Sequence, residues 1–288
     1  KHILDKSYKA FNKNLIKKKF EKINFKLLKF KAKKKSKIFL DLFSGVGGFS
    51  IGLKRAGYQP ILSADNDKSV IETHKFNFPN IPIVEEQLQS KEVEKKILKI
   101  IDNKEVDLLV GGPPCQGFSI FGKRRFVNTK EFDPKTDKRN NLVLTFWKYV
   151  ELIKPKWVIM ENVGGFPSLE KGFFLRKIVT MLPRIGYKNF DYRILNTADY
   201  GVPQKRKRFI LIANRTGNLI PWPKPKFFQE PKDWQKPYRT VGEVITDLAT
   251  NSSRKRVSNH EPMNHSKEII ERYSYVKEGK KMDVRSEE

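Results

Sequence analysis

The stretch Asp41-Leu-Phe-Ser-Gly-Val-Gly-Gly-Phe49 closes the first apolar run of the chain and decides its fold. The run over 38–43 has the length and composition of a buried strand, and small residues follow it directly. Glycines at such a strand-to-helix turn let the backbone approach a ligand at the carboxyl edge of a sheet. The spacing matches neither the G-x-G-x-x-G dinucleotide fingerprint nor a phosphate-binding P-loop. Because glycine turns are often purely structural, this stretch alone leaves ligand binding open.

Short apolar runs alternate with longer amphipathic segments on the C-terminal side of this turn. We expect further strands over 60–65, 81–84, 106–110, 157–160, 189–195 and 208–213. We expect helices over 47–57, 68–77, 91–101, 142–153 and 170–184, and after residue 215 one clear helix over 241–249. This order predicts an α/β fold, with a Rossmann-like, doubly wound and mostly parallel sheet.

The charge of the chain is strongly positive. It has 59 Lys and Arg against 32 Asp and Glu, which gives a formal net charge of +27. A charge of this size favours a polyanionic partner, most often nucleic acid, although a lysine-rich proteome would also raise the total. Residues 1–37 hold 15 Lys and only two acids, Asp5 and Glu21. A basic amphipathic helix in this segment would bind nucleic acid or, as the weaker alternative, a membrane surface.

Composition also excludes several classes of protein. No stretch approaches the roughly 18 apolar residues that a membrane-spanning helix needs, so we expect no transmembrane protein. The single cysteine, Cys115, excludes an intrachain disulfide and a multi-cysteine zinc site, and we expect no metal. The first residues lack the apolar core of a secretory signal, so we expect a reducing, cytoplasmic compartment.

Other predicted strands also end in residues that can bind a ligand or take part in catalysis. Asp65 ends the second strand, where an acid can bind ribose hydroxyls, and with the glycine turn it indicates an adenosine-type ligand. The fourth strand ends in Gly111-Gly-Pro-Pro-Cys115-Gln-Gly-Phe-Ser119. A lone cysteine is usually a buried filler. Here two prolines stiffen the backbone before Cys115, and the flanking Pro and Gly favour a nucleophile over a core position.

Two further blocks lie at strand ends. Glu161-Asn162-Val163 follows the run over 157–160, where a carboxyl group suits a proton donor, with a helix cap or an ion pair as the alternatives. The block Gln204-Lys-Arg-Lys-Arg208 leads into the last run. In an extended chain Arg206 and Arg208 point the same way, although a solvated basic edge is the more common reading of such a block alone.

Taken together, these blocks resemble the cytosine-C5 DNA methyltransferase family. The matching segments are Asp41–Gly48, Gly111–Ser119, Glu161–Val163 and Gln204–Arg208, in that order over about 170 residues. The resemblance implies the S-adenosylmethionine-dependent methyltransferase fold, with S-adenosyl-L-methionine as cofactor and S-adenosyl-L-homocysteine as product. It implies methylation of carbon 5 of a flipped-out cytosine in double-stranded DNA, within a prokaryotic restriction–modification system.

The resemblance also implies roles for individual residues. Cys115 would add to carbon 6 of cytosine, Glu161 would hold the N3 and N4 edge, and Arg206 would bind O2. Arg208 would order the site and Asn162 would support the pocket. The cofactor-binding set would be Asp41, Phe43, Ser44, Gly45, Gly48, Asp65, Asn66, Gln87, Pro113 and Leu142, with Phe43 stacking on adenine. The DNA-binding set would be Gln116, Ser119, Lys123, Arg124, Arg125, Arg139 and Gln204, mostly from a loop over 117–140 that closes on phosphates.

The chain departs from the family pattern in two places. Gln87 stands where many members carry an Asp that bonds the adenine amino group, with Glu86 beside it. After Arg208 we find neither the full target-recognition region nor the Arg-Glu-x-x-Arg-Leu-Gln-type and Gly-Asn-x-Val segments, and residues 1–37 hold no Gly-Asn-x-Val either. We therefore expect a basic extension over 1–36, a catalytic methyltransferase domain over 37–215 and an incomplete lead-in to the recognition region over 216–288. Such a chain is either truncated or completed by a second subunit.

Two rival functions remain open at this point. The first is methylation of cytosine in tRNA by the same chemistry, although the Cys-Phe-Thr segment usual in the RNA-acting branch is absent. The second is a non-catalytic, DNA-binding half of a split enzyme, against which the presence of Cys115, Glu161, Arg206 and Arg208 argues.

Overall fold

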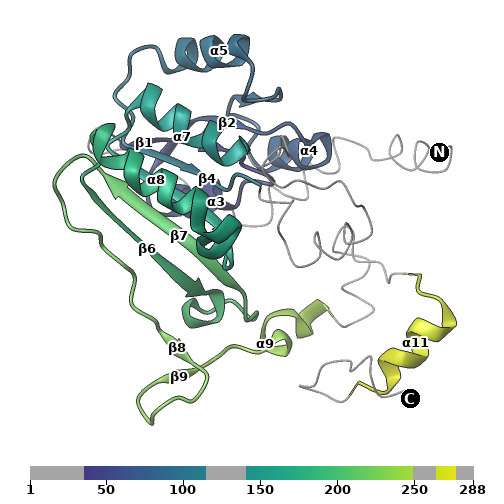
Figure 1. Ribbon diagram of the computed structural model, residues 1–288. Coiled ribbons are helices and arrows are strands. Elements are labelled where there is room, and N and C mark those ends of the chain that lie inside the picture. The colour runs from purple at the N-terminus through teal and green to yellow at the C-terminus, as the bar shows by residue number, and fades with distance from the viewer. Residues whose placement is uncertain (1–35, 115–140, 249–263, 277–288) are drawn as a thin grey trace, which may run out of the picture. The chain divides into compact units, whose positions relative to one another are not determined.

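The computed structural model describes residues 36–114, 141–248 and 264–276 (Figure 1). The chain divides into two compact units. One comprises Lys1–Asn196 and Lys207–Lys224, and the other comprises Thr197–Arg206 and Pro225–Glu288. Within the described ranges, no helix combines the length and apolar character that crossing a bilayer requires.

A seven-stranded sheet with the order β3-β2-β1-β4-β5-β7-β6 forms the centre of the first unit (Figure 1). Its strands are β1 Ile38–Leu42, β2 Gln59–Ala64, β3 Ile83–Val84, β4 Leu108–Gly111, β5 Trp157–Val163, β6 Asn189–Asn196 and β7 Lys207–Asn214. The first five strands are parallel, whereas β7 runs antiparallel to both β5 and β6. The predicted mostly parallel α/β sheet is therefore confirmed, and its carboxyl edge collects the ends of β1, β2, β4 and β5.

Helices pack on both faces of this sheet. They are α3 Gly48–Arg55, α4 Lys68–Asn77, α5 Lys91–Ile101, α7 Asn141–Ile153 and α8 Phe173–Arg184, with the 3-10 segment η3 Phe166–Gly172 before α8. The larger core cluster joins β1, β2, β4, β5 and β7 to α5, α7 and α8. A smaller cluster on the other face joins Phe39, Leu108 and Val110 to Phe49 and Leu53 of α3. Figure 1 shows α7 and α8 lying across one face of the sheet.

The boundaries of these elements follow from local chemistry. The α4 helix begins after Asp67, whose carboxylate accepts a hydrogen bond from Ser69 N at 2.9 Å, and α5 begins after Ser90 in the same manner. Both helices match their predicted ranges. The helix predicted over 170–184 begins only at Phe173, because Glu170 and Lys171 have φ angles of 46° and 52°. Such left-handed backbone cannot continue a right-handed helix.

The second unit contains shorter elements. They are η4 Thr197–Tyr200, β8 Phe227–Phe228, β9 Lys236–Pro237, α9 Val241–Ile245, η5 Thr246–Leu248 and α11 Lys267–Ser274. Thr240 and Glu243 form a capping box that begins α9. The clear helix expected over 241–249 forms as α9 followed by η5, and α11 forms in addition to it. Its eight residues span little more than two turns, too few for a distinct helical period in the sequence.

Candidate active site

The glycine turn between β1 and α3 has an unusual backbone conformation. Phe43, Gly45 and Gly47 have φ angles of 57°, 53° and 93°. Phe43 is sterically strained in this left-handed conformation, whereas glycine would not be. Strain of this kind concentrates at functional sites. Its side chain is half-buried against the larger core cluster. The left-handed Phe43 also explains why β1 ends at Leu42, one residue before the predicted boundary.

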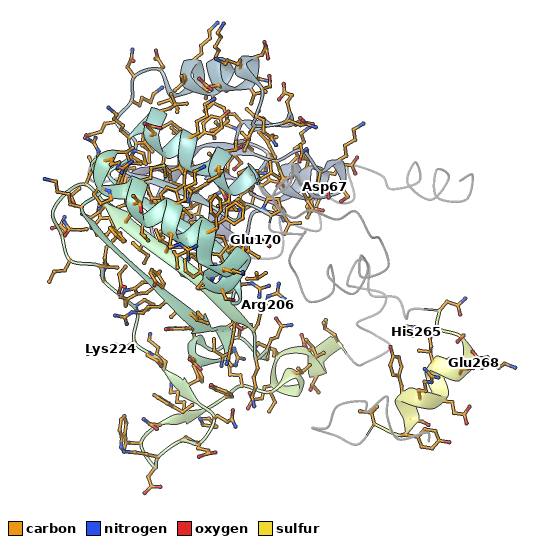
Figure 2. All side chains as sticks on the ribbon, in the orientation of Figure 1. Asp67, Glu170, Arg206, Lys224, His265 and Glu268 are labelled. Carbon is orange, nitrogen blue, oxygen red and sulfur yellow. The ribbon has the colours of Figure 1, made fainter. Side chains whose placement is uncertain are left out.

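Asp65, which follows β2, fixes the conformation of this turn. Its Oδ2 accepts a hydrogen bond from Gly45 N at 2.8 Å, and its Oδ1 accepts one from Asp67 N at 3.0 Å. Figure 2 shows Asp67 at the start of α4. The sheet contributes as well, because Ser44 N donates to Ala64 O at 3.0 Å. The turn is thus held by the adjacent parallel strand, and the half-buried Asp65 carboxylate retains lone pairs for a ligand.

Space and unpaired polar atoms lie beside the turn. A β-carbon built on Gly45 or Gly48 would meet no other atom within 4 Å. Ser44 Oγ and Asp41 Oδ1 are buried, and neither has a hydrogen-bond partner among the described residues. Buried polar atoms normally find partners, so these atoms, the open space and the nearby Asp65 fit the adenosine-type ligand expected from the sequence.

Asp41 lies beneath the turn and is fully buried. Its Oδ2 accepts hydrogen bonds from Ser50 Oγ at 2.7 Å and Ser50 N at 3.2 Å, which anchor the first turn of α3. Burial is the largest influence on this carboxyl group and raises its pKa to about 7, although the hydrogen bonds from Ser50 act in the opposite direction. Asp41 therefore changes charge close to neutral pH.

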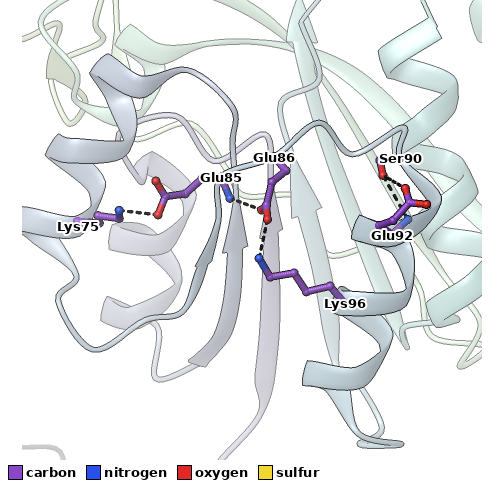
Figure 3. Close-up of polar contacts among 6 residues, drawn as sticks. All are labelled: Lys75, Glu85, Glu86, Ser90, Glu92 and Lys96. Carbon is purple, nitrogen blue, oxygen red and sulfur yellow. Dashed lines mark hydrogen bonds and ion pairs between the residues drawn. The ribbon is translucent and has the colours of Figure 1, made fainter.

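The segment after β3 carries the departure at Gln87. The side chain of Gln87 is exposed. Both neighbouring acids are engaged in ion pairs, Glu85 with Lys75 at 2.5 Å and Glu86 with Lys96 at 2.7 Å (Figure 3). Asn66, two residues after the end of β2, is also exposed. Gln87 therefore presents an exposed amide, while the two carboxylates that precede it are paired with lysines.

The ends of β4 and β5 are packed closely together. Gly111 pairs with Met160 in the sheet, and a β-carbon on Gly111 would overlap Leu42 O and the ring of Phe146. A β-carbon on Gly112 would lie 3.2 Å from Glu161 Oε2. These two glycines therefore allow β4 to end against β1 on one side and against the carboxyl group of Glu161 on the other.

Asn162 ties β5 to the proline turn that follows β4. Its Nδ2 donates to Pro113 O at 3.1 Å, and its Oδ1 accepts from Val163 N at 2.9 Å. Both Asn162 and Pro113 are buried. Cys115, two residues after Pro113 in the sequence, lies outside the described residues. The hydrogen bond nevertheless anchors the backbone from which Cys115 continues.

Glu161 pairs with Arg208, as one of the alternatives from the sequence anticipated. Arg208 Nε lies 2.7 Å from Glu161 Oε1, and the two side chains are 20% and 31% exposed. The register of β5 and β7 places Val163 opposite Arg208, so Glu161 is its diagonal neighbour. Long side chains reach one another across such a diagonal. The guanidinium therefore orients the carboxylate within the sheet.

Arg206 belongs to the second unit and is exposed (Figure 2). Its carbonyl accepts from Thr197 N at 3.0 Å, and Gln204 O accepts from Thr197 Oγ1 at 2.6 Å. The strand β7 begins only at Lys207, so Arg206 lies outside it. The bond from Thr197 N to Arg206 O continues the register of β6 and β7, in which Asn196 pairs with Lys207, so the backbone contact reaches one residue beyond β7. That Arg206 and Arg208 point the same way stays a prediction.

The remaining predicted residues are less informative. Leu142 is half-buried in the first turn of α7. Seven predicted site residues lie outside the described part of the chain: Cys115, Gln116, Ser119, Lys123, Arg124, Arg125 and Arg139. In the ranges 36–114, 141–248 and 264–276, His, Cys, Asp and Glu form no group that could hold a metal ion.

Comparisons with known proteins bear on this site. A family model described as C-5 cytosine-specific DNA methylase matches residues 38–286. The Type II methyltransferase M1.HphI of Haemophilus parahaemolyticus is 36% identical over 261 residues, which cover 89% of this chain and 65% of that protein. M.AquIA of Picosynechococcus sp. is 35% identical over 229 residues, covering 74% of this chain and 89% of that protein.

A solved structure gives a similar result. A putative DNA modification methyltransferase encoded within an E. coli prophage has 31% sequence identity and a TM-score of 0.51, over 62% of this chain and 47% of that one. The chain spans 65% of M1.HphI and 46% of a further relative, the Type II methyltransferase M.XorII of Xanthomonas oryzae, which is 36% identical over 213 residues and 73% of this chain.

Proposed function

The chain belongs to the C-5 cytosine-specific DNA methylase family, and from this premise we propose that it methylates carbon 5 of cytosine in double-stranded DNA. The proposal includes S-adenosylmethionine as methyl donor and a role among the Type II methyltransferases of restriction–modification systems. One observation carries it. The strand β5 supplies Glu161 and, through Asn162, holds the carbonyl of Pro113 in the turn that leads into Cys115.

Cys115 acts as the nucleophile in this proposal. Carbon 5 of cytosine is too weakly nucleophilic to be methylated directly. The thiolate sulfur of Cys115 adds to carbon 6, and the electron pair of the 5–6 double bond becomes available at carbon 5. Methyl transfer uses this pair and releases S-adenosylhomocysteine. Carbon 5 then loses its proton to a base, the electron pair of that C–H bond re-forms the 5–6 double bond, and the sulfur departs from carbon 6 as a thiolate. The buried bond from Asn162 to Pro113 O limits how far the backbone before Cys115 can shift.

Glu161 holds the base during this sequence. Its carboxyl group binds the N3 and N4 edge of cytosine and stabilises the charge that thiolate addition places there. The ion pair with Arg208 at 2.7 Å fixes Oε1, while Oε2 lies on the side of Gly112. Arg206 binds O2 of the base. Because the reacting atoms lie inside the duplex stack, the base must be flipped out, and the loop over 117–140 with Gln204 contacts the DNA.

The carboxyl edge of β1 and β2 holds the cofactor. When bound, S-adenosylmethionine supplies an electrophilic methyl group to carbon 5. Phe43 stacks on the adenine, and the open sides of Gly45 and Gly48 let the backbone approach the ligand. Asp65 accepts from the ribose hydroxyls with the lone pairs that Gly45 N and Asp67 N leave available. Gln87 offers its amide to the adenine amino group, and Leu142 lines the adenine site.

Methyl transfer and covalent capture together test the proposal. The full chain, supplemented in trans with a family fragment that carries the recognition region and the Gly-Asn-x-Val segment, is incubated with unmethylated duplex DNA and tritiated S-adenosylmethionine, with tRNA as a parallel substrate. We expect label in DNA as 5-methylcytosine and none in tRNA. We also expect duplex DNA containing 5-fluorocytosine to form a denaturation-resistant adduct, because fluorine replaces the proton that must leave carbon 5. Cys115→Ser should form neither product, and Glu161→Gln should slow transfer by about 10² or more.

Calorimetric titration with S-adenosylhomocysteine provides the control for these variants. Binding at the wild-type affinity shows that the substituted protein is folded and that the loss is chemical. Methyl transfer by Cys115→Ser would exclude the covalent mechanism. Label in tRNA would contradict the proposed activity, as would the absence of label in DNA when the segments not found after Arg208 are supplied in trans.

A further inference from the structure

Phe78 packs directly against the glycine turn. It follows α4, is only 5% exposed, and lies so close to Gly47 that a β-carbon there would overlap its Cε2 atom. The carbonyl of Gly47 accepts from Ile51 N at 2.9 Å and so belongs to the first turn of α3. The Phe78 ring therefore supports the turn from the side of α4.

His74 holds this ring from within the protein. Its side chain is completely buried, and its ring centroid lies 4.9 Å from that of Phe78. Neither ring nitrogen of His74 has a hydrogen-bond partner in the described part of the chain. Burial lowers the pKa of the imidazole, opposed in part by the charge of Asp65. An imidazole in these surroundings is neutral near pH 7, and a proton on it would have no buried partner.

The charged groups around His74 and Phe78 connect them to the turn. Asp65 is the group whose charge acts on His74, and its Oδ2 also accepts from Gly45 N at 2.8 Å. On the α3 side, Lys54 Nζ lies 5.2 Å from the centroid of the Phe78 ring. An imidazolium at His74 would be attracted to the Asp65 carboxylate and repelled by Lys54. Movement of the charged ring towards Asp65 or away from Lys54 would disturb the contacts that fix Gly45 and Gly47.

We propose that His74 and Phe78 are positioning residues for the cofactor turn, and that protonation of His74 releases this turn and weakens cofactor binding in acid. This inference rests on the proposed function, in which the turn binds S-adenosylmethionine. Phe78 acts as a spacer that keeps Gly47 in its left-handed conformation. The neutral His74 ring keeps Phe78 in its place against Gly47, and the cofactor site is complete only while that ring is uncharged.

Calorimetric titration of S-adenosylhomocysteine into the full chain between pH 5 and pH 8 tests this. We expect wild-type affinity to fall progressively as the pH is lowered, because only the neutral His74 ring keeps the turn in place and burial shifts its pKa to the acid side of the ordinary value. His74→Phe should bind normally at pH 8 and lose this decline. Phe78→Ala should bind more weakly at every pH, with partial rescue in Phe78→Leu, since only a bulky side chain fills the space beside Gly47.

The matched control is His265→Phe, the same substitution at a histidine that packs on Tyr273 of α11 in the second unit. It should leave the wild-type pH profile unchanged. Asp41 also titrates in this range, and it is present in every variant, so the difference between wild type and His74→Phe isolates the histidine. If His74→Phe fails to unfold cooperatively, His74→Leu replaces it.

The outcomes separate the inference from the function. A wild-type chain that binds at pH 8 but shows no decline in acid overturns the inference, as does a decline that His74→Phe retains. Both results leave the cofactor site in place. A wild-type chain that binds no S-adenosylhomocysteine at any pH instead contradicts the proposed function, and the inference falls with it.

Discussion

Asp41 illustrates how one buried residue couples the turn to pH. Its Oδ2 is held by Ser50, and the carboxyl group has no access to water. Its pKa is about 7 in the folded protein against 3.8 as the ordinary value. Between these values the folded state holds a proton that the unfolded state has released. The contribution of Asp41 to stability therefore falls as the pH rises through this window.

Asp41→Asn should remove this dependence. The neutral amide has nearly the same shape and cannot ionise, so the variant should gain relative to wild type as the pH rises. Between pH 5 and pH 8 the difference in unfolding free energy should shift by roughly 2 to 3 kcal/mol in favour of the variant. Urea unfolding at several pH values measures it. The titration of His74 occurs in both proteins and cancels, and parallel stability curves would refute the prediction.

At the scale of elements, the end of β4 depends on two consecutive glycines with different surroundings. A β-carbon on Gly111 would overlap Leu42 O, a backbone atom that cannot move without shifting β1. A β-carbon on Gly112 would meet only Glu161 Oε2, the far end of a side chain, at 3.2 Å. The overlap at Gly111 would distort the sheet, whereas the contact at Gly112 would displace a side chain of the proposed active site.

Alanine substitution should separate these two roles. Gly111→Ala should lower the unfolding free energy by about 3 kcal/mol or more, because overpacking forces backbone to move. Gly112→Ala should cost under about 1 kcal/mol, because a flexible carboxyl group can yield, but it should reduce methyl transfer by displacing Glu161. Thermal unfolding and the tritium assay measure both effects. Equal losses of stability in the two variants would contradict the difference in surroundings between Gly111 and Gly112.

The elements that the sequence predicts well are those with local signals. Helices α4 and α5 begin directly after Asp67 and Ser90, residue types that cap helices, and their predicted ranges agree with the structure. The acid and amide at the end of β5 and the acid after β2 likewise follow from their places after apolar runs. These features depend on a few residues of chain, so propensity and period suffice to find them.

Contacts between distant segments could not be predicted in this way. The overlap of Phe78 with Gly47 and the bond from Asn162 to Pro113 O join residues 31 and 49 positions apart. Such tertiary contacts depend on residues that are distant in the sequence, so the local periodicity of the sequence does not predict them.

At the scale of the whole molecule, charge is concentrated in one sequence segment. Residues 1–36 contain 14 Lys and two acids, which is 12 of the net +27 charges. A chain that begins at Lys37 keeps the Lys37 carbonyl, which accepts from Gln59 N at 2.8 Å beside β1. Removing 1–36 should therefore spare the sheet while removing almost half of the net positive charge.

This deletion should weaken DNA binding through its salt dependence. Each phosphate contact contributes about 0.9 to the slope of log K against log salt concentration, so we expect the slope to fall by roughly 3 or more. Affinity for S-adenosylhomocysteine should stay unchanged. Fluorescence anisotropy with one labelled duplex at several salt concentrations gives both slopes. Identical slopes for the full and shortened chains would mean that this segment does not approach the DNA.

The hydrogen bond from Asn162 to Pro113 has a consequence for mechanical tolerance. The distance between two reacting groups varies more when flexible segments separate the elements that carry them. Here the acid and the amide are consecutive residues of β5, and a single hydrogen bond reaches the carbonyl two residues before the proposed nucleophile. A small displacement of Asn162 is therefore transmitted directly to the Pro113 carbonyl, without an intervening flexible segment.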